Sequence, residues 1–317
     1  MELIKKSVVL DFDQKRIICS LPLRGEEEDF LTSNRDRAAK VLEQQCKKYH
    51  NDVATKEVIL KAFRKIFDNG HAGPVHQLTE QERQAFSHKP VSYYIPWRVV
   101  FSDSVSTPCR PVLDGSSSTR LRPDGKGGRC LNDLVAKGKI ETINLLRMLL
   151  RFCIGKFAFC GDLKQFYNSC KLLPQYWNLQ RFLWKDDLNP ESEVIEMVMK
   201  TLIYGVKSVS CQSEEAKLQL AEAVKTMFPD VYKLILEAIY VDDIGESKAT
   251  KEECTRIMQE ADITFEMVGL SVKDWTETRY PRMDLQWEWV DFDEIHLLTA
   301  WKSKFLVSTL GRKSKEN

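Results

Sequence analysis

The stretch Ile239-Tyr240-Val241-Asp242-Asp243-Ile244-Gly245 places two adjacent carboxylates between two short apolar segments. Apolar residues on both sides of a polar pair are typical of a β-hairpin with the pair at its tip. An Asp-Asp pair in a turn also has a plain structural explanation, because Asp favours turns. The stretch predicts a hairpin, and its function depends on the residues that lie beside it.

A third carboxylate follows another apolar strand. Residues 157–160 read Phe-Ala-Phe-Cys and give way to Gly161-Asp162. If this strand neighbours the hairpin in one sheet, Asp162, Asp242 and Asp243 converge at its edge. Like charges at such short range repel one another, so the cluster is costly unless a cation neutralises it. Oxygen ligands alone select a hard cation, and two Mg²⁺ ions about 3.5–4 Å apart would stabilise the attacking and leaving oxygens of a phosphoryl transfer.

The composition is that of a soluble globular protein. The chain has 317 residues, of which 43% are hydrophobic and 29% charged. It contains no run of about 18 apolar residues, and its first twenty residues contain no signal-peptide core, so no membrane span or export is expected. The nine cysteines fit neither a zinc ribbon nor a disulfide framework, and we expect free thiols.

Charge is distributed unevenly along the chain. Residues 95–175 carry thirteen Lys/Arg against six Asp/Glu, a local balance of +7, whereas the remainder carries thirty-four against forty. Such asymmetry indicates one basic face that meets an anion. A chance excess on a solvated surface is the alternative explanation.

Predicted strands alternate irregularly with predicted helices. This order predicts an α+β fold, with helices packed on one side of an antiparallel sheet. Helices are expected from Ser33 or Asn34, over 56–67, from Thr79, within 131–152, over 208–227 and from the Thr250 cap; strands are expected at 7–10, 16–21, 98–101, 157–160, 181–184, 197–203 and 285–289.

Four of these segments resemble motifs of reverse transcriptases. Tyr240-Val241-Asp242-Asp243 is similar to their YxDD box, and residues 159–167 resemble their first palm motif, an Asp followed five residues later by an aromatic. Residues 97–101 resemble the fingers strand whose basic residue contacts the incoming triphosphate. Residues 204–208 resemble the glycine-containing motif before the palm helix.

The similarity is closest to the reverse transcriptases of BEL/Pao-type LTR retrotransposons, and it covers nearly the whole chain. Ser210 stands where that family usually has Pro, and Met283-Asp284-Leu285 where it tends to have Leu-Gly-Leu. The further segments that carry the resemblance are Ser20-Leu21-Pro22-Leu23, Asn34-Arg35, Gly70-His71-Ala72, Leu131-Asn132-Asp133-Leu134, Arg181-Phe182-Leu183-Trp184, Leu270-Ser271-Val272-Lys273-Asp274-Trp275 and Leu285-Gln286-Trp287.

The resemblance implies a right-hand polymerase fold with fingers and palm, an antiparallel palm sheet backed by helices, and a thumb that is largely absent. Residues 1–90 would form a strand-plus-helical region that packs on the fingers, residues 91–299 the fingers and palm, and residues 300–317 a tail. The expectation is a fragment of a longer polyprotein, or an isolated gene derived from one.

The resemblance also implies the site. Asp162, Asp242 and Asp243 would be catalytic and hold two Mg²⁺ ions, with Mn²⁺ as a substitute. The implied nucleotide-binding residues are Arg98, Leu163, Tyr167, Gly205 and Lys273.

The resemblance implies a role in nucleotide binding for each of these residues, and three of them also have a purely structural explanation. Tyr167 would stack beneath the sugar and exclude a 2′-hydroxyl, or else be a half-buried core aromatic. Arg98 would pair with triphosphate oxygens through its planar fork, or else be a solvated strand arginine. Gly205 would let template or nucleotide approach the backbone, or else form a strand-to-helix turn. Lys273 would lie near the leaving pyrophosphate.

The implied activity is that of an RNA-directed DNA polymerase core, with dNTPs and an RNA or DNA template-primer duplex as partners and no membrane. The expected compartment is intracellular, namely the cytoplasm, a virus-like particle or the nucleus. One alternative is a catalytically inactive or domesticated nucleic-acid-binding remnant of the same fold. Another is a two-metal nuclease, which would have no use for Tyr167.

Overall fold

The computed structural model describes residues 2–24, 31–86, 91–103, 107–125, 127–139 and 143–279. The strand expected at 285–289 and the tail 300–317 lie outside these residues. Its helices are α1 (Glu2–Lys6), α2 (Arg35–Tyr49), α3 (Val53–Asp68), α4 (Glu80–Phe86), α5 (Leu131–Leu134), α6 (Leu145–Phe152), α7 (Phe166–Ser169), α8 (Val209–Val224), α9 (Pro229–Glu237) and α10 (Lys251–Glu266), with 3-10 turns η2 (Val75–Gln77) and η3 (Pro174–Gln180).

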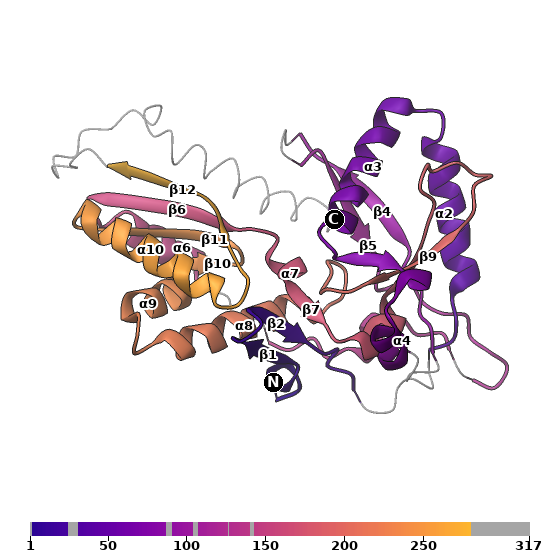
Figure 1. Ribbon diagram of the computed structural model, residues 1–317, viewed down its shortest axis with the longest axis horizontal. Helices are drawn as coiled ribbons and strands as arrows, with labels where there is room; N and C mark the ends of the chain where they lie inside the picture. Colours follow the sequence, from indigo (N-terminus) through magenta and orange to yellow (C-terminus); the bar gives the residue numbers. More distant parts are fainter. Residues whose placement is uncertain are drawn as a thin grey trace.

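A four-stranded antiparallel sheet holds the predicted hairpin. Its order is β10 (Ile239–Tyr240), β11 (Asp243–Lys248), β6 (Phe157–Leu163) and β12 (Val272–Arg279). Figure 1 shows this sheet in one lobe of the molecule, with α10 alongside it and α8 and α9 beneath. The sheet is central to the site because β6 and the hairpin are neighbours in it.

Helices lie on both faces of this sheet, so the expected one-sided packing is wrong. Trp275 on β12 contacts the Phe159 ring and donates its indole N–H to Asp262 of α10, at 3.0 Å. On the other face, the hydroxyl of Ser247 donates to the carbonyl of Arg151 in α6, at 2.9 Å. The apolar side of α6 explains this second layer, because buried Met148 packs against Tyr240.

Helix α10 begins where the sequence predicts. The Thr250 hydroxyl accepts from the Glu253 backbone N–H at 3.2 Å, and the Glu253 carboxylate accepts from the Thr250 N–H at 3.1 Å. This capping box satisfies donors that the first helical turn leaves unpaired. The residues Cys254, Ile257, Ala261 and Phe265 recur at helical spacing and are buried.

The N-terminal region shares sheets with later parts of the chain. Strands β1 (Val8–Asp11) and β2 (Arg16–Cys19) form a sheet with β7 (Cys170–Leu172), in which β2 and β7 are parallel. Strand β3 (Ala72–Pro74) pairs with β9 (Ile195–Met199), which pairs with β8 (Arg181–Trp184). Strands before position 90 therefore share sheets with strands that follow it.

The second lobe is built around buried aromatic rings. The ring of Phe63 on α3 lies 4.9 Å from that of Trp97 and 4.2 Å from that of Trp184. Trp97 belongs to β4 (Trp97–Phe101), which pairs antiparallel with β5 (Cys109–Leu113). Such rings bury large apolar areas, so this cluster fixes the β4–β5 hairpin on α3.

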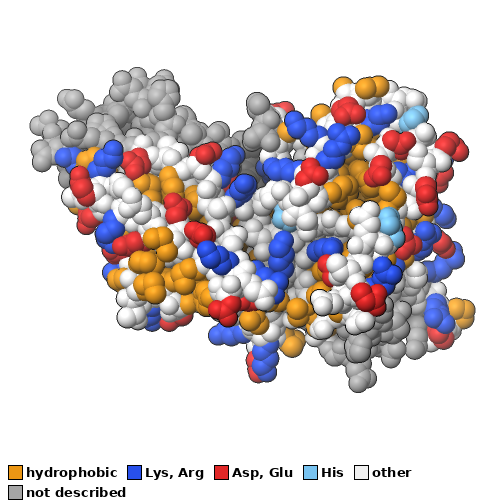
Figure 2. All heavy atoms as spheres, in the orientation of Figure 1, with side chains coloured by type: hydrophobic (Ala, Val, Ile, Leu, Met, Phe, Trp, Pro, Cys, Tyr) orange, Lys and Arg blue, Asp and Glu red, His pale blue; other side chains and the backbone are white. Residues whose placement is uncertain are grey.

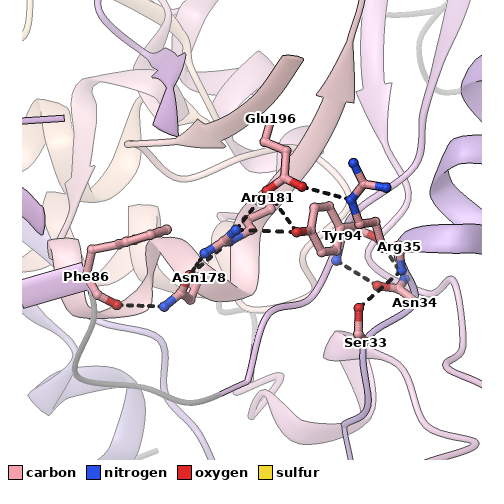
Figure 3. Close-up of polar contacts among 8 residues, drawn as sticks. All are labelled: Ser33, Asn34, Arg35, Phe86, Tyr94, Asn178, Arg181 and Glu196. Carbon is pink, nitrogen blue, oxygen red and sulfur yellow. Dashed lines mark hydrogen bonds and ion pairs between the residues drawn. The ribbon is translucent and has the colours of Figure 1, made fainter. Parts of the chain in front are cut away.

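Polar contacts fasten the start of α2 to the strands of this lobe (Figure 3). The Asn34 side chain donates to the Tyr94 carbonyl and accepts from its N–H, both at 2.7 Å. Arg181 donates to Asn178 and to Glu196, each at 2.9 Å, and the Asn178 amide donates to the Phe86 carbonyl. These bonds satisfy buried groups that would otherwise be costly.

The architecture is thus mixed α and β with small antiparallel sheets, as the α+β prediction requires. All nine cysteines are free, which confirms the cysteine prediction.

Candidate functional site

The tip of the β10–β11 hairpin is a two-residue turn. Tyr240 pairs with Asp243, which leaves Val241 and Asp242 as the turn residues. Val241 has a φ of 61°. A left-handed conformation costs an L-residue about 1–2 kcal/mol, and a β-branched side chain adopts it rarely. Strain of this kind gathers at functional sites, where the surrounding structure maintains it.

Strand β6 brings the third carboxylate to this tip. Asp162 lies directly opposite Asp243 on β11 and directly opposite Lys273 on β12. Opposed residues of paired strands project from the same face of a sheet, so these three side chains are neighbours. The Leu163 backbone N–H donates to the Asp242 carbonyl at 2.8 Å and joins the turn to β6. The structure thus gathers Asp162, Asp242, Asp243 and Lys273 at one sheet edge.

Within the residues that the structure describes, no three His, Cys, Asp or Glu side chains are grouped closely enough to hold a metal ion by themselves. The chemistry of the donors nevertheless fits the predicted ion. Mg²⁺ in phosphoryl-transfer enzymes is bound by one or two carboxylates, with water and substrate phosphates completing the shell. Asp162 and Asp242 suffice for such a set.

Two tyrosines in edge-on contact lie beside the carboxylates. The Tyr167 side chain on α7 is buried, and its ring centroid lies 4.6 Å from that of Tyr204 in an edge-on contact. Tyr204 is 56% exposed. Partial burial raises the pKa of Tyr204, and the negative charges of Asp242 and Asp162 raise it further. Tyr204 is therefore the outer aromatic of the site, and the sequence reasoning gave it no role.

The β4–β5 hairpin carries two arginines on one face. Arg98 lies opposite Val112, and Arg110 lies opposite Val100, so both arginines project from the exposed side. The charge of Arg110 lowers the pKa of Tyr204, so Arg110 lies within electrostatic reach of the outer tyrosine. The sequence reasoning chose only Arg98, although residues 109–113 have a similar strand pattern.

Gly205 is required by the protein's own backbone. Its φ is 107°, and a Cβ atom there would lie 1.8 Å from the carbonyl oxygen of Leu113 at the end of β5. The Asn132 side chain donates to the Gly205 carbonyl at 2.8 Å and accepts from the Lys207 N–H at 2.9 Å. The close approach predicted for this glycine is thus made by β5, and contact with a nucleotide stays a prediction.

Leu163 belongs to the core. Its side chain is buried, and its backbone N–H is bonded to Asp242. Its assignment as a nucleotide-binding residue stays a prediction, and in the described structure its N–H joins the hairpin to β6.

A buried lysine lies behind the strained turn. Lys217 on α8 is 2% exposed, donates to the Val241 carbonyl at 3.2 Å and pairs with Glu214 at 2.8 Å. Sequence reasoning missed it, because a lysine on an otherwise ordinary helix face carries no motif. Lys217 holds the turn from the side opposite to solvent.

Replacing Lys217 tests whether it holds the β10–β11 turn in place. Lys217→Met leaves the Glu214 carboxylate and the Val241 carbonyl without their cation, so we expect a loss of about 3 kcal/mol in the free energy of unfolding. The matched control is Lys225→Met, since the Lys225–Glu222 pair has the same i,i+3 spacing but is exposed. That control should lose less than about 0.5 kcal/mol in urea unfolding. Equal losses for the two variants would contradict the positioning role.

The opposed carboxylates of Asp162 and Asp243 allow a second prediction. Asp243→Asn removes one of two like charges facing each other, so without divalent cation the free energy of unfolding should rise by about 0.5–1 kcal/mol. Adding Mg²⁺ should stabilise the wild type more than the variant, because the cation binds the folded state. Thermal unfolding with and without Mg²⁺ measures both effects. Identical Mg²⁺ responses would show that Asp243 takes no part in binding.

No protein-family model matches this chain, and no curated protein matches it. Among the described residues, none of the helices combines the length and the apolar character needed to cross a membrane. The class defined by fold and site is a mixed α/β protein with a carboxylate-bearing sheet edge.

Proposed function

We propose that this chain is the core of an RNA-directed DNA polymerase, similar to the reverse transcriptases of BEL/Pao-type retrotransposon polyproteins, with a right-hand arrangement of fingers and palm. The observation that carries the proposal is the direct pairing of Asp162 with Asp243 across β6 and β11, with Asp242 beside the strained Val241 in the β10–β11 turn. A turn that merely contained two acids would need neither the third carboxylate nor the strain.

The residues around this edge suit nucleotidyl transfer. Asp162 and Asp242 would hold Mg²⁺, with Asp243 beside them. A bound divalent cation stabilises charge on the attacking and leaving oxygens of a phosphoryl transfer. Arg110 and Arg98 offer planar donors to the triphosphate of a dNTP. Lys273 provides a positive charge next to Asp162.

The aromatic pair supplies a basis for choosing deoxynucleotides. Tyr204 is the exposed ring, and it rests on the buried Tyr167. A ring held from beneath cannot yield to an extra 2′-hydroxyl. In this proposal Tyr204 contacts the sugar and Tyr167 supports it, which refines the steric function expected of Tyr167.

A second candidate is a non-catalytic nucleic-acid-binding protein of the same fold. The observation that favours it is that the described residues contain no group of three side chains arranged as a metal site. Such a protein would bind a duplex through phosphate contacts, with strongly salt-dependent affinity.

Primer extension distinguishes the two candidates. The full chain is incubated with a labelled primer on an RNA or a DNA template, Mg²⁺ or Mn²⁺, and either dNTPs or rNTPs. Extension with dNTPs in clear preference to rNTPs supports the polymerase. Salt-sensitive duplex binding without extension under either metal supports the second candidate and contradicts the first.

A further inference from the structure

A polar pocket lies beside α7, and its lining includes none of Asp162, Asp242, Asp243 and Lys273. It has a volume of about 240 Å³ and forms where four distant segments meet: the β1–β2 turn, the end of α3, the chain from α7 into β7, and the turn after α10. Its lining residues are Lys15, Arg16, Asn69, His71, Gln165, Ser169, Lys171, Val268 and Gly269. Figure 2 shows Lys and Arg side chains gathered over the middle of the molecule, where Figure 1 places β2, β7 and α7.

The lining includes three full cations, Lys15, Arg16 and Lys171, and none of the lining residues is acidic. Lys15 pairs with Glu266 at 2.8 Å, but both side chains are largely exposed, so the pair is weak. Arg16 makes a single long contact of 3.4 Å with Asp11.

Lys171 is the cation with the least compensation. It is half-buried on β7, and among the described side chains no acid forms an ion pair with it. Burial lowers the pKa of Lys171, Cys170 opposes part of this shift, and the nearby charge of Lys200 adds to it. Its charged form is thus less stable here than in water, and a bound anion would restore that stability.

His71 adds a buried polar group to the same wall. Its side chain is 6% exposed, and its Nε2 lies 3.0 Å from the Gln165 amide oxygen. Its Nδ1 is buried and has no hydrogen-bond partner among the described atoms. Burial lowers the pKa of His71, and the charge of Lys171 lowers it further. The contact with Gln165 holds this imidazole in the wall of the pocket.

The pocket and the tyrosine pair lie on different sides of the turn at residues 165–169. Gln165 and Ser169 line the pocket and are four residues apart, which places them on one face of a helical turn. Tyr167 lies between them in sequence, and so its ring projects away from the pocket toward Tyr204.

We propose that this pocket binds a phosphate-bearing anion, held by Lys171 and Arg16 with Lys15 at its rim. At about 30 Å³ per water molecule, the volume corresponds to about eight waters, room for a di- or triphosphate group. The same chemistry suits a small polyphosphate or a phosphate of a nucleic-acid backbone. The site is independent of the polymerase proposal, because it uses none of the carboxylates.

Calorimetric titration of the full chain tests the proposal, with inorganic tripolyphosphate in one arm and a single-stranded oligodeoxynucleotide in the other. Lys171→Gln should weaken binding of the anion about tenfold or more, the loss expected for one hydrogen bond to a charged group. Arg16→Gln, on a more exposed side chain, gives a second variant should Lys171→Gln fail to fold. Lys40→Gln removes the same charge from α2, outside the pocket, and should leave affinity unchanged.

If the pocket variants bind tripolyphosphate more weakly but bind the oligonucleotide as the wild type does, the ligand is a small polyphosphate. If they bind only the oligonucleotide more weakly, the ligand is a backbone phosphate. The proposal is overturned if wild type binds neither anion, or if Lys40→Gln weakens binding as much as the pocket variants do.

Discussion

Asp162→Asn should abolish primer extension while leaving the fold intact. Asp162 is the central carboxylate of the site, since its strand lies between β11 and β12 and its neighbours are Asp243 and Lys273. The substitution keeps the size of the side chain but removes a full anionic ligand. Because stabilisation of the developing charge is commonly the largest catalytic contribution, the rate of extension should fall by about 10³-fold or more. Single-turnover extension with saturating dNTP measures it.

Asp13→Asn is the matched control, because Asp13 is an exposed carboxylate in the β1–β2 turn, away from the site. It should leave the rate unchanged. Duplex affinity of Asp162→Asn should be at least that of the wild type, since the carboxylate repels phosphate rather than binding it. An Asp162→Asn variant that extends primers at the wild-type rate would remove this residue from the catalytic set.

Gly205→Ala should strongly destabilise the protein. A Cβ at this position would lie 1.8 Å from the Leu113 carbonyl oxygen, and the backbone φ of 107° is unfavourable for alanine. The loop at Gly205 cannot move freely, because the Asn132 side chain bonds to the Gly205 carbonyl and to the Lys207 N–H. We expect a loss of at least about 4 kcal/mol in the free energy of unfolding, a large part of the stability of an ordinary domain.

Gly70→Ala separates the cost of the steric contact from the cost of the left-handed backbone conformation. Gly70 has a φ of 66°, but a Cβ there would meet nothing within 4 Å. It should therefore lose only about 1 kcal/mol, the cost of the backbone conformation alone. Guanidinium unfolding of the two variants side by side makes the comparison. Equal losses would mean that the contact with Leu113 is not rigid.

Local patterns in the sequence predicted the hairpin that carries two of the carboxylates and the helix that follows it. The Thr250 cap, the apolar face of α10 and the hairpin around Asp242 are each encoded within a few residues. The sequence predicts that Asp162 joins Asp242 and Asp243 if its strand neighbours the hairpin, and β6 does pair with β11. Short-range chemistry decides such features, so reasoning from spacing and residue type reaches them.

Other features depend on contacts between distant segments and left no local trace. The parallel pairing of β2 with β7 joins residues about 150 positions apart in the chain. Lys217 reaches Val241 only because α8 passes behind the hairpin. Arg98 and Arg110 have similar surroundings in the sequence, and only the strand register shows that they share a face. Tertiary packing decides all three, which is why sequence patterns did not.

Incorporation of a single labelled dNTP on an RNA template tests the central claim most directly. The wild-type chain, with Mg²⁺ and a primer one nucleotide short of a defined template base, should add the complementary dNTP and reject the matching rNTP. Asp162→Asn should add neither. Failure of the folded wild type to add any nucleotide with either Mg²⁺ or Mn²⁺, while it binds the duplex, would contradict the polymerase assignment.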